Sequence, residues 1–193
     1  SLFLIDSDSP GISSRHYPTV DGRRASEITL ENVKVGKSSL LGLKDKGFKE
    51  LDNSVDTATL AICAEAVGAM EVLYKSTVEY TKTRKQFGQA IGKFQVLQHR
   101  MVDMFMEYEQ CKSLLYMATV KKVEDSADAK KSISGLKFQV GKAGKFIGQQ
   151  SIQLHGGMGV TDELNIGHFF KRLTTIATIF GNTDYHLKRY SEL

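Results

Sequence analysis

Two short stretches of the chain carry residue types that suit a ligand containing a diphosphate. The first, "RKQFGQAIGKFQ" at residues 84–95, provides the planar guanidinium of Arg84, the amide of Gln95 and the flat apolar ring of Phe87. The second, "QLHGGMG" at residues 153–159, has three glycines, where a ligand can approach the backbone and accept hydrogen bonds from its amides. Each stretch alone also fits a surface arginine or a helix-ending glycine cluster, because short motifs are weak evidence.

A third stretch, "TIATIFGNTDYHLKRY" at residues 174–189, interrupts a helical pattern at Gly181. A glycine inside a helix costs about 1 kcal/mol relative to alanine, so this position needs a specific explanation. Two histidines, His155 and His186, belong to these stretches. We expect both to bond the loop backbone rather than to act as bases.

Three long apolar stripes, with spacings of three and four residues, predict the helices that would position these stretches. The first stripe comprises Leu51, Val55, Ala58, Ile62, Ala66, Ala69 and Leu73. The second comprises Phe94, Leu97, Met101, Met104, Tyr108, Cys111, Leu115 and Ala118. The third comprises Ala129, Ile133, Leu136, Val140, Ala143, Ile147 and Leu154. Ser126 or Asp128 is expected to cap the third helix, and a shorter helical pair, broken at residues 180–182, is expected to follow it. We therefore predict a mainly α fold, an antiparallel four-helix bundle, whose long seams would also serve assembly between subunits.

The first part of the chain has a different pattern. "SLFLID" predicts a buried strand that needs strands on either side, and its partners are largely lacking from this sequence. A second strand pattern is shown by Ile28, Leu30, Val33 and Val35. We therefore expect residues 1–47 to be the end of a β domain and residues 48–193 to be the helical bundle domain.

Composition narrows the class of protein. Of 193 residues, 41% are hydrophobic, which suffices for one core, and the net charge of +4 is spread along the chain without the basic stripe of a nucleic-acid-binding protein. Cys63 and Cys111 lie inside helical patterns, so we expect small buried residues and no disulfide or metal site. We see no apolar run of membrane-spanning length and no leader. We expect a cytoplasmic protein in a reducing compartment, with neither a nucleic acid nor a membrane as partner.

Taken together, the two loop stretches resemble the C-terminal helical domain of the acyl-CoA dehydrogenase family. The resemblance is carried by "TRKQFGQAIGKFQVLQHRMVDM" and "QLHGGMGVTDELNIGHFFKRL". "LFLIDSDSPGISS" and "ITLENVKVGKSSLLG" likewise look like the end of that family's middle β domain. Family members are about twice as long and begin with another helical domain, so the resemblance implies that this chain is a C-terminal half.

The resemblance implies an FAD site. Arg84 would face the pyrophosphate, and Gln86 and Phe87 would line the adenosine end. Phe94 and Gln95 would belong to the same surface. The other predicted cofactor-binding positions are Gln153, Gly156, Gly157 and Thr183. In the family this surface serves the flavin bound mainly by a neighbouring subunit, so dimerisation completes the site and this chain alone is not expected to bind FAD tightly.

The resemblance also explains the question posed by Gly181. The family's proton-abstracting glutamate commonly stands in a Tyr-Glu-Gly-Thr motif, and here the matching residues are Phe180, Gly181, Asn182 and Thr183. Gly181 therefore occupies the base position, where we expect a larger local space. Phe180 and Gly181 would line the substrate pocket.

Some members carry the base on the first long helix instead. There the match is Ala58, followed by Thr59 where many members have arginine. No catalytic residue can be assigned. The remaining carboxylates near the pocket are Asp56, Asp184 and Glu65. Of these, Asp56 is expected to contact the acyl-CoA, together with Thr59.

Three functions stay open at this point. The chain would belong to a flavin-dependent acyl-CoA dehydrogenase that forms homo- or hetero-oligomers, dimers or tetramers, and passes electrons to another flavoprotein. In its sharper form it is the base-lacking subunit of a two-subunit dehydrogenase, like those acting on steroid side chains or dicarboxylic acyl chains. The alternatives are a non-catalytic assembly bundle and a flavin oxidase or monooxygenase on the same fold, which would not need the glutamate.

Overall fold

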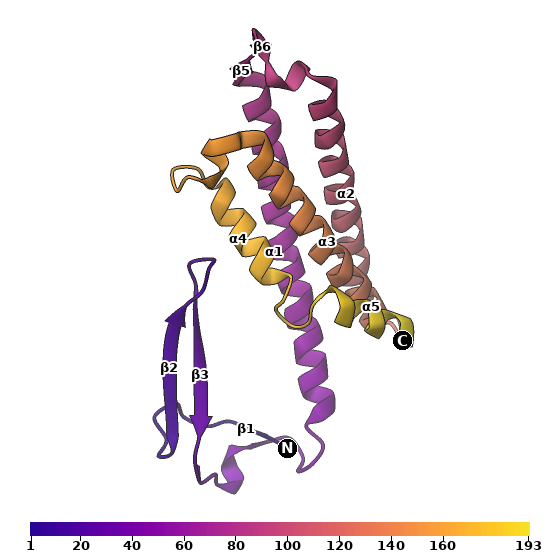
Figure 1. The fold of residues 1–193 in the computed structure, drawn as a ribbon. Coiled ribbons are helices and arrows are strands. Elements are labelled where there is room, and N and C mark those ends of the chain that lie inside the picture. The colour runs from indigo at the N-terminus through magenta and orange to yellow at the C-terminus, as the bar shows by residue number, and fades with distance from the viewer. The chain divides into compact units, whose positions relative to one another are not determined.

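The computed structural model describes all 193 residues (Figure 1). They divide into two compact units, residues 1–55 and residues 56–193. The boundary expected between residues 47 and 48 coincides with the start of the first long helix at Phe48. That boundary stays a prediction about domain organisation.

The first unit holds two short antiparallel pairs of strands. The longer pair is the hairpin of β2 (Ile12–Pro18) and β3 (Arg24–Leu30), in which the first residue of β2 is opposite the last residue of β3. The shorter pair joins β1 (Leu2–Phe3) to β4 (Leu40–Leu41), and the 3-10 turn η1 (Lys37–Ser39) leads into β4.

Two expectations for this unit need correction. The first segment is not a buried strand, because Phe3 is 45% and Leu4 is 70% exposed. These side chains are exposed because β1 pairs with only one strand, the two-residue β4, and nothing covers the faces of β1. The second strand ends at Leu30 and does not reach Val35, because Asn32 has a left-handed φ of 52° that cannot continue a strand.

The second unit is helical, as predicted, and Figure 1 shows its long helices running side by side in alternating directions. The elements in chain order are α1 (Phe48–Thr83), which begins within the first unit, β5 (Lys85–Gln86), β6 (Gln89–Ala90), η2 (Ile91–Lys93), α2 (Gln95–Val123), α3 (Ala129–His155), η3 (Gly156–Val160), α4 (Ile166–Ile176) and α5 (Thr183–Glu192). The expected break in the last helical pair is real, since α4 and α5 are separated by residues 177–182. Asp128 is the N-cap residue of α3, although its side chain makes no capping hydrogen bond.

The core follows the predicted stripes in α2 and α3. All seven residues of the α3 stripe are buried, and those of α2 are buried or half-buried. In α1 the stripe holds from Ala66 onward, but earlier the buried face begins with Asp56, Thr59 and Cys63, while Leu51 is 47% exposed. The prediction for the first turns of α1 is therefore wrong by about one position, because Asp56 is neutralised by a distant arginine described below and so lies inside.

Small residues on α3 allow the last helices to pack closely. A Cβ atom on Gly148 would lie 2.5 Å from Cδ2 of Phe170 in α4, and one on Gly141 would lie 2.6 Å from Cγ2 of Thr183 in α5. Glycine at these two positions therefore lets α4 and α5 approach the backbone of α3. The predicted cofactor-binding residue Thr183 consequently packs against α3.

Both cysteines are buried and free, as expected. Cys63 and Cys111 are each 0% exposed. Burial raises the pKa of both thiols to about 12. No group of three or more His, Cys, Asp or Glu side chains is arranged to hold a metal ion.

One helix, α1, is long and apolar enough to meet the criterion for a membrane span. This corrects the expectation that no apolar run reaches that length. A core helix of a soluble protein meets the same criterion, and α1 places Met70 and Leu73 in the core of the bundle.

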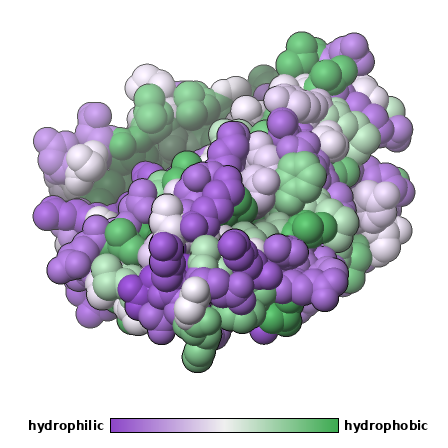
Figure 2. Space-filling view, turned by 90° about the horizontal axis from the view of Figure 1, so that it is seen from above, coloured by the Kyte–Doolittle hydropathy of each residue, from purple (hydrophilic) through white to green (hydrophobic).

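Apolar side chains are also exposed along the outer face of α2. We call the following residues the α2 apolar face: Val96, Val102, Phe105, Met106, Tyr116, Met117, Val120 and Val123. Figure 2 shows apolar residues interspersed with polar ones over one face of the molecule. Single exposed apolar residues are ordinary, but this set recurs in both halves of α2, with no member between Met106 and Tyr116.

Candidate functional site

The two loop stretches meet in one cavity of about 400 Å³, here called the loop pocket. It is lined by Tyr80, Arg84, Gln86, Ile91, Gln153, Leu154, His155, Gly156, Gly157 and Met158. Five of these residues are cofactor-binding positions predicted from the sequence. The fold brings them together because the end of α1 and the end of α3 lie at the same end of the bundle (Figure 1).

Arg84 is fixed at its backbone and free at its side chain. Its N–H donates to the carbonyl of Tyr80 at 2.9 Å, and its own carbonyl accepts from the N–H of Ile91 at 2.9 Å, which folds the hairpin back onto α1. The exposed guanidinium has no partner within the chain. It can therefore present its donors to an anion.

The glycine loop differs in one respect from the expectation of free amides. The N–H of Gly156 donates to the carbonyls of Gln153 and Ile152, because this residue caps the C-terminal end of α3. Its φ of 61° and ψ of −138° suit glycine. At Gly157 no atom lies within 4 Å of a built Cβ, so a ligand has room to approach the backbone there.

Tyr80 and His155 form a side of the pocket that the sequence analysis did not assign. Their rings stack with centroids 4.3 Å apart, and the Tyr80 hydroxyl donates to the carbonyl of His155 at 3.4 Å. Nδ1 of His155 donates to the carbonyl of Ser151 at 2.8 Å, as expected of a histidine that bonds the backbone. Burial lowers the pKa of His155. Tyr80 could have been assigned to the pocket from the sequence, because it stands four residues, or one helical turn, before Arg84.

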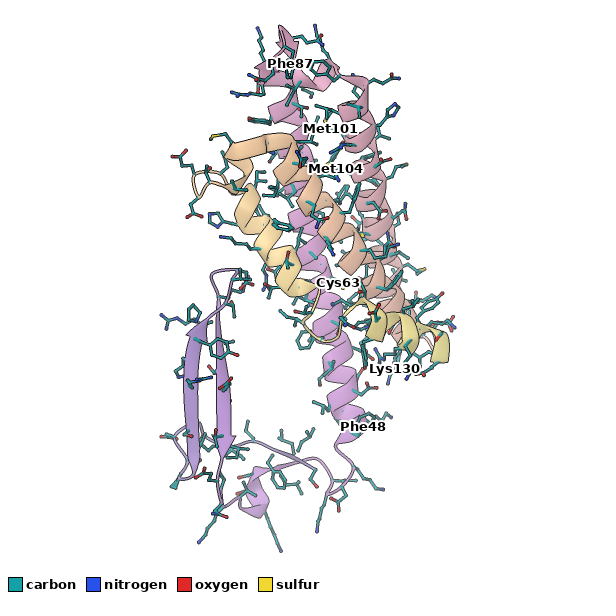
Figure 3. The ribbon with its side chains drawn as sticks, viewed as in Figure 1. Phe48, Cys63, Phe87, Met101, Met104 and Lys130 are labelled. Carbon is teal, nitrogen blue, oxygen red and sulfur yellow. The ribbon has the colours of Figure 1, made fainter.

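Phe87 forms the tip of the β5–β6 hairpin (Figure 3). It is 90% exposed and has a left-handed φ of 54°, which is unusual for a bulky residue. Its ring contacts that of Phe94 edge to face, with centroids 6.1 Å apart. Gln95, the first residue of α2, is also exposed. Phe87, Phe94 and Gln95 follow Arg84 and Gln86 closely along the chain, but they do not line the loop pocket.

Of the predicted substrate residues, Phe180 and Gly181 lie at the turn between α4 and α5, whereas Asp56 and Thr59 lie on α1. Phe180 has a φ of 57° and Gly181 a φ of 106°. A Cβ on Gly181 would lie 2.9 Å from Cε1 of Tyr185 and 3.0 Å from Nε2 of His186. The expectation of a larger local space at Gly181 is therefore wrong, because the rings of the first turn of α5 fill it.

Hydrogen bonds from two buried side chains, Lys137 and His186, hold this turn. Nζ of Lys137 donates to the carbonyls of Gly181, at 2.8 Å, and Ala177, at 3.4 Å. Nε2 of His186 donates to the carbonyl of Phe180 at 2.9 Å, so it was correctly expected to bond the backbone, and Nδ1 is left without a partner. Burial lowers the pKa of both Lys137 and His186.

None of the three candidate carboxylates is placed as a ready base. Asp56 is 1% exposed, and Arg189 donates to both its oxygens. Glu65 accepts two hydrogen bonds from Arg172, at 2.6 and 2.8 Å. Asp184 is exposed in the first turn of α5. A substrate contact at Asp56 would need the Arg189 pair to open, and Thr59 is likewise only 1% exposed.

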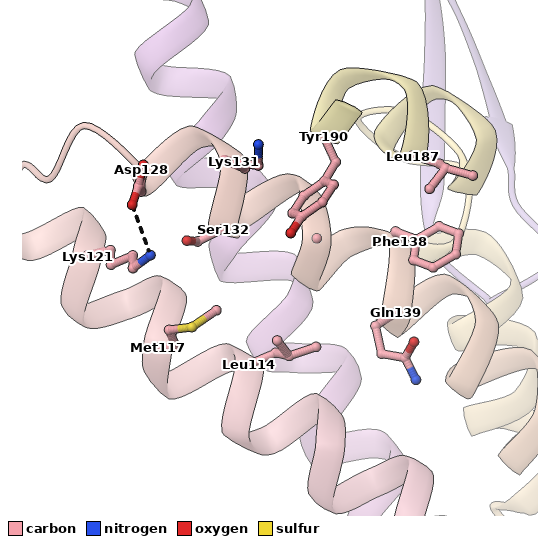
Figure 4. A pocket seen from close by; sticks show the side chains of 11 residues that line it. Leu114, Met117, Lys121, Asp128, Lys131, Ser132, Phe138, Gln139, Leu187 and Tyr190 are labelled. Carbon is pink, nitrogen blue, oxygen red and sulfur yellow. Dashed lines mark hydrogen bonds and ion pairs between the residues drawn. The ribbon is translucent and has the colours of Figure 1, made fainter. Parts of the chain in front are cut away.

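A cavity larger than the loop pocket lies elsewhere. It encloses about 610 Å³ between the end of α2, the start of α3 and α5 (Figure 4). Lys121 and Asp128 form an ion pair of 3.5 Å at its edge. None of the residues predicted for the cofactor or the substrate lines it, so size alone does not mark the functional site.

Comparison with known proteins gives a consistent family. Residues 45–192 match the family model described as "Acyl-CoA dehydrogenase, C-terminal domain". The chain is 30% identical over 187 residues to "Caffeyl-CoA reductase-Etf complex subunit CarC" of Acetobacterium woodii, covering 95% of this chain and 49% of that relative. The chain spans about half the length of the curated relatives it matches.

Solved structures agree with this. "PigA with FAD and proline" superposes with a TM-score of 0.93 at 28% identity, over 98% of this chain and 50% of that one. The Tcur3481-Tcur3483 steroid ACAD gives a TM-score of 0.85 at 27% identity, with the same coverage. The chain therefore belongs to the acyl-CoA dehydrogenase family, and its helical part is the C-terminal domain of that family.

Proposed function

We propose that this chain is the C-terminal portion of an FAD-dependent enzyme that dehydrogenates an acyl-CoA thioester between its α and β carbons. The observation that carries the proposal is the loop pocket, in which Arg84, Gln86 and Gln153 converge with the glycine turn at residues 156–157. Family membership supports the reaction class, and the structure of PigA with FAD supports the cofactor.

The residues of the loop pocket fit the ADP part of FAD. Arg84 would bind the pyrophosphate through its free guanidinium, and the backbone at Gly157 is open to close approach. The exposed ring of Phe87 offers a flat apolar face to the adenine. When bound, the flavin would supply the acceptor for the hydride that leaves the β carbon. This chain would help to hold and orient an FAD molecule that is bound mainly by a neighbouring subunit.

In the sharper form of the proposal, this chain is the base-lacking subunit of a two-subunit dehydrogenase. Its support is that position 181 carries no side chain and that the carboxylates of Asp56 and Glu65 are each bound by an arginine. The likeness to a steroid ACAD with two named components is in keeping with this form. The partner subunit would then provide the base.

Assembly follows from the same proposal. The α2 apolar face and the exposed end of α1, with Phe48 at 79% and Leu51 at 47% exposure, offer surface for a homo- or hetero-oligomer, dimer or tetramer. Static light scattering of the whole protein should give at least a dimeric mass, and a monomeric mass at roughly tens of micromolar would count against assembly.

An electron-accepting flavoprotein is a further proposed partner, supported by the relative named as part of an Etf complex. A cytoplasmic location stays a prediction.

Arg84→Ala in the whole protein tests the cofactor site. Removal of the guanidinium should weaken FAD binding by about 1.5 to 3 kcal/mol, because the pyrophosphate loses a charge-assisted partner. Flavin absorbance after gel filtration measures the retained FAD. Lys85→Ala, one residue along on the exposed strand β5, is the matched control and should retain its flavin. Equal occupancy in both variants would mean that the loop pocket is not the FAD site.

The alternative functions give different outcomes in one assay. A flavin oxidase or monooxygenase would consume oxygen when it receives its substrate, whereas a dehydrogenase would reduce an added dye or a flavoprotein. A non-catalytic bundle would do neither and would not need the free guanidinium of Arg84. Oxygen consumption and dye reduction, measured side by side on the whole protein with FAD bound, separate the three.

A further inference from the structure

Lys137 is an unusual residue to find in the core of this bundle. Its side chain is 1% exposed in the middle of α3, and no acidic side chain forms an ion pair with it. Burial of a charge without a partner is strongly unfavourable, so its hydrogen-bond acceptors matter. The acceptors are the backbone carbonyls of Gly181 and Ala177, at 2.8 and 3.4 Å from Nζ.

These carbonyls are located where a cation is favoured. Ala177 is the C-cap residue of α4, and the last carbonyls of a helix have no partner within it. They also carry the negative end of the helix dipole. The ammonium of Lys137 therefore donates to a carbonyl at the C-terminal end of α4. It also donates to the carbonyl of Gly181, four residues further along the chain.

The turn between them has a backbone that needs support. Phe180 and Gly181 both have left-handed φ angles, of 57° and 106°, and the phenylalanine is disfavoured there. The carbonyl of Phe180 is held by His186, and the side chain of Asn182 accepts from the N–H of Tyr185 at 2.9 Å to cap α5. Lys137, on α3, donates the hydrogen bonds to the carbonyls of Ala177 and Gly181 in this turn.

We infer that Lys137 is a positioning residue, whose buried ammonium fixes the turn at residues 177–182 and so sets the backbone of Gly181 at the position where the family's base stands. This inference rests on the proposed function for its relevance to catalysis. The contact is to the backbone of Gly181, so it would shape the pocket wall whichever side chain stood at that position. Lys137 does not line the loop pocket.

Amide hydrogen exchange of the whole protein, followed by mass spectrometry, tests the inference. Lys137→Met keeps the length of the side chain and removes its three donors. We expect exchange in peptides covering residues 177–183 to speed up by roughly tenfold, with α2 unchanged. Lys145→Met, the same change at an exposed position of α3, is the control and should leave the turn unchanged.

Rescue separates positioning from general stability. Lys137→Arg, which keeps charged donors, should return exchange at residues 177–183 at least halfway to the wild-type rate. Should Lys137→Met fail to fold, Lys137→Gln is examined in the same way. Unchanged exchange at the turn, or an equal acceleration throughout the bundle, would overturn the inference. Because exchange needs neither FAD nor turnover, a negative result in the flavin assay leaves this test intact.

Discussion

Arg189 in α5 binds Asp56 in α1 through both carboxylate oxygens, at 2.6 and 3.1 Å, although the two residues are 133 positions apart. The same guanidinium donates to Oγ of Ser134 in α3 at 3.3 Å. The Asp56 side chain is 1% exposed and that of Arg189 is 17% exposed. The short helix α5 is thereby tied to both the first and the third helix of the bundle.

Removal of one member of this pair should destabilise the fold substantially. Asp56→Ala leaves the Arg189 charge without its carboxylate in a largely buried site, which typically costs about 3 to 5 kcal/mol of unfolding free energy. Urea denaturation measures the change. The control is Glu79→Ala in the exposed Glu79–Lys82 pair, where a loss of about 0 to 1 kcal/mol is expected. Similar small losses in both variants would mean that α5 is not held by this pair.

Two glycine-to-alanine substitutions should have opposite signs. Gly148→Ala places a methyl group 2.5 Å from the ring of Phe170, so overpacking of about 1 to 3 kcal/mol should exceed the gain in helix propensity. Gly68→Ala in α1 meets no atom within 4 Å and should stabilise by up to about 1 kcal/mol. Thermal denaturation compares the two. A stabilised Gly148→Ala variant would show that α3 and α4 are not in close contact.

The histidines predict a loss of stability in acid. Burial lowers the pKa of His155 and His186 below the ordinary value of 6.5, so the unfolded chain binds protons first as the pH falls. Their contribution to the unfolding free energy is therefore present above pH 6.5 and is lost progressively as the pH falls below it.

His186→Gln should flatten part of this pH dependence, whatever its effect at neutral pH. The measurement is the unfolding free energy in urea at about pH 7.5 and about pH 5. His99→Gln, at an exposed position of α2, is the matched control and should keep the wild-type difference. An equal difference in all three proteins would contradict the assignment of His186 as buried and neutral.

Regular features of the fold could be read from the sequence. The α3 stripe from Ala129 to Leu154 is buried as predicted, because its spacing follows the helical period without interruption. The break at Phe180–Asn182 was also visible, since glycine and asparagine are poor helix formers. These predictions depend only on neighbours along the chain.

Features that depend on distant partners could not be read. Asp56 is buried because Arg189 neutralises it from the other end of the domain, a pairing that no neighbour along the chain indicates, and its expected contact with acyl-CoA stays a prediction. Gly181 was expected to open space, yet the ring of Tyr185 occupies that space once the turn adopts its left-handed backbone. Arg84 and four other pocket residues could be grouped through family resemblance, whereas the stacked pair of Tyr80 and His155 required the structure.

The geometry at Gly181 makes a specific prediction about restoring the base. Gly181→Glu in the whole protein should give no more than trace dehydrogenation, because any L side chain there meets the ring of Tyr185 and must adopt a φ of 106°. The additional change Tyr185→Ala removes the ring but not the backbone strain, so it should add little. Recovery of robust turnover by Gly181→Glu alone would mean that the turn rearranges freely.

The most direct measurement is the turnover of acyl-CoA thioesters by the whole protein as a purified homo-oligomer with FAD bound. Medium-chain, dicarboxylic and steroid thioesters are tested with a reducible dye, alone and after mixing with a related subunit that carries the glutamate. Proton abstraction and hydride loss must occur in one pocket, so a flavin site without a base should be inactive. We predict no dye reduction by the homo-oligomer and activity after mixing, whereas robust turnover by the homo-oligomer alone would contradict the account.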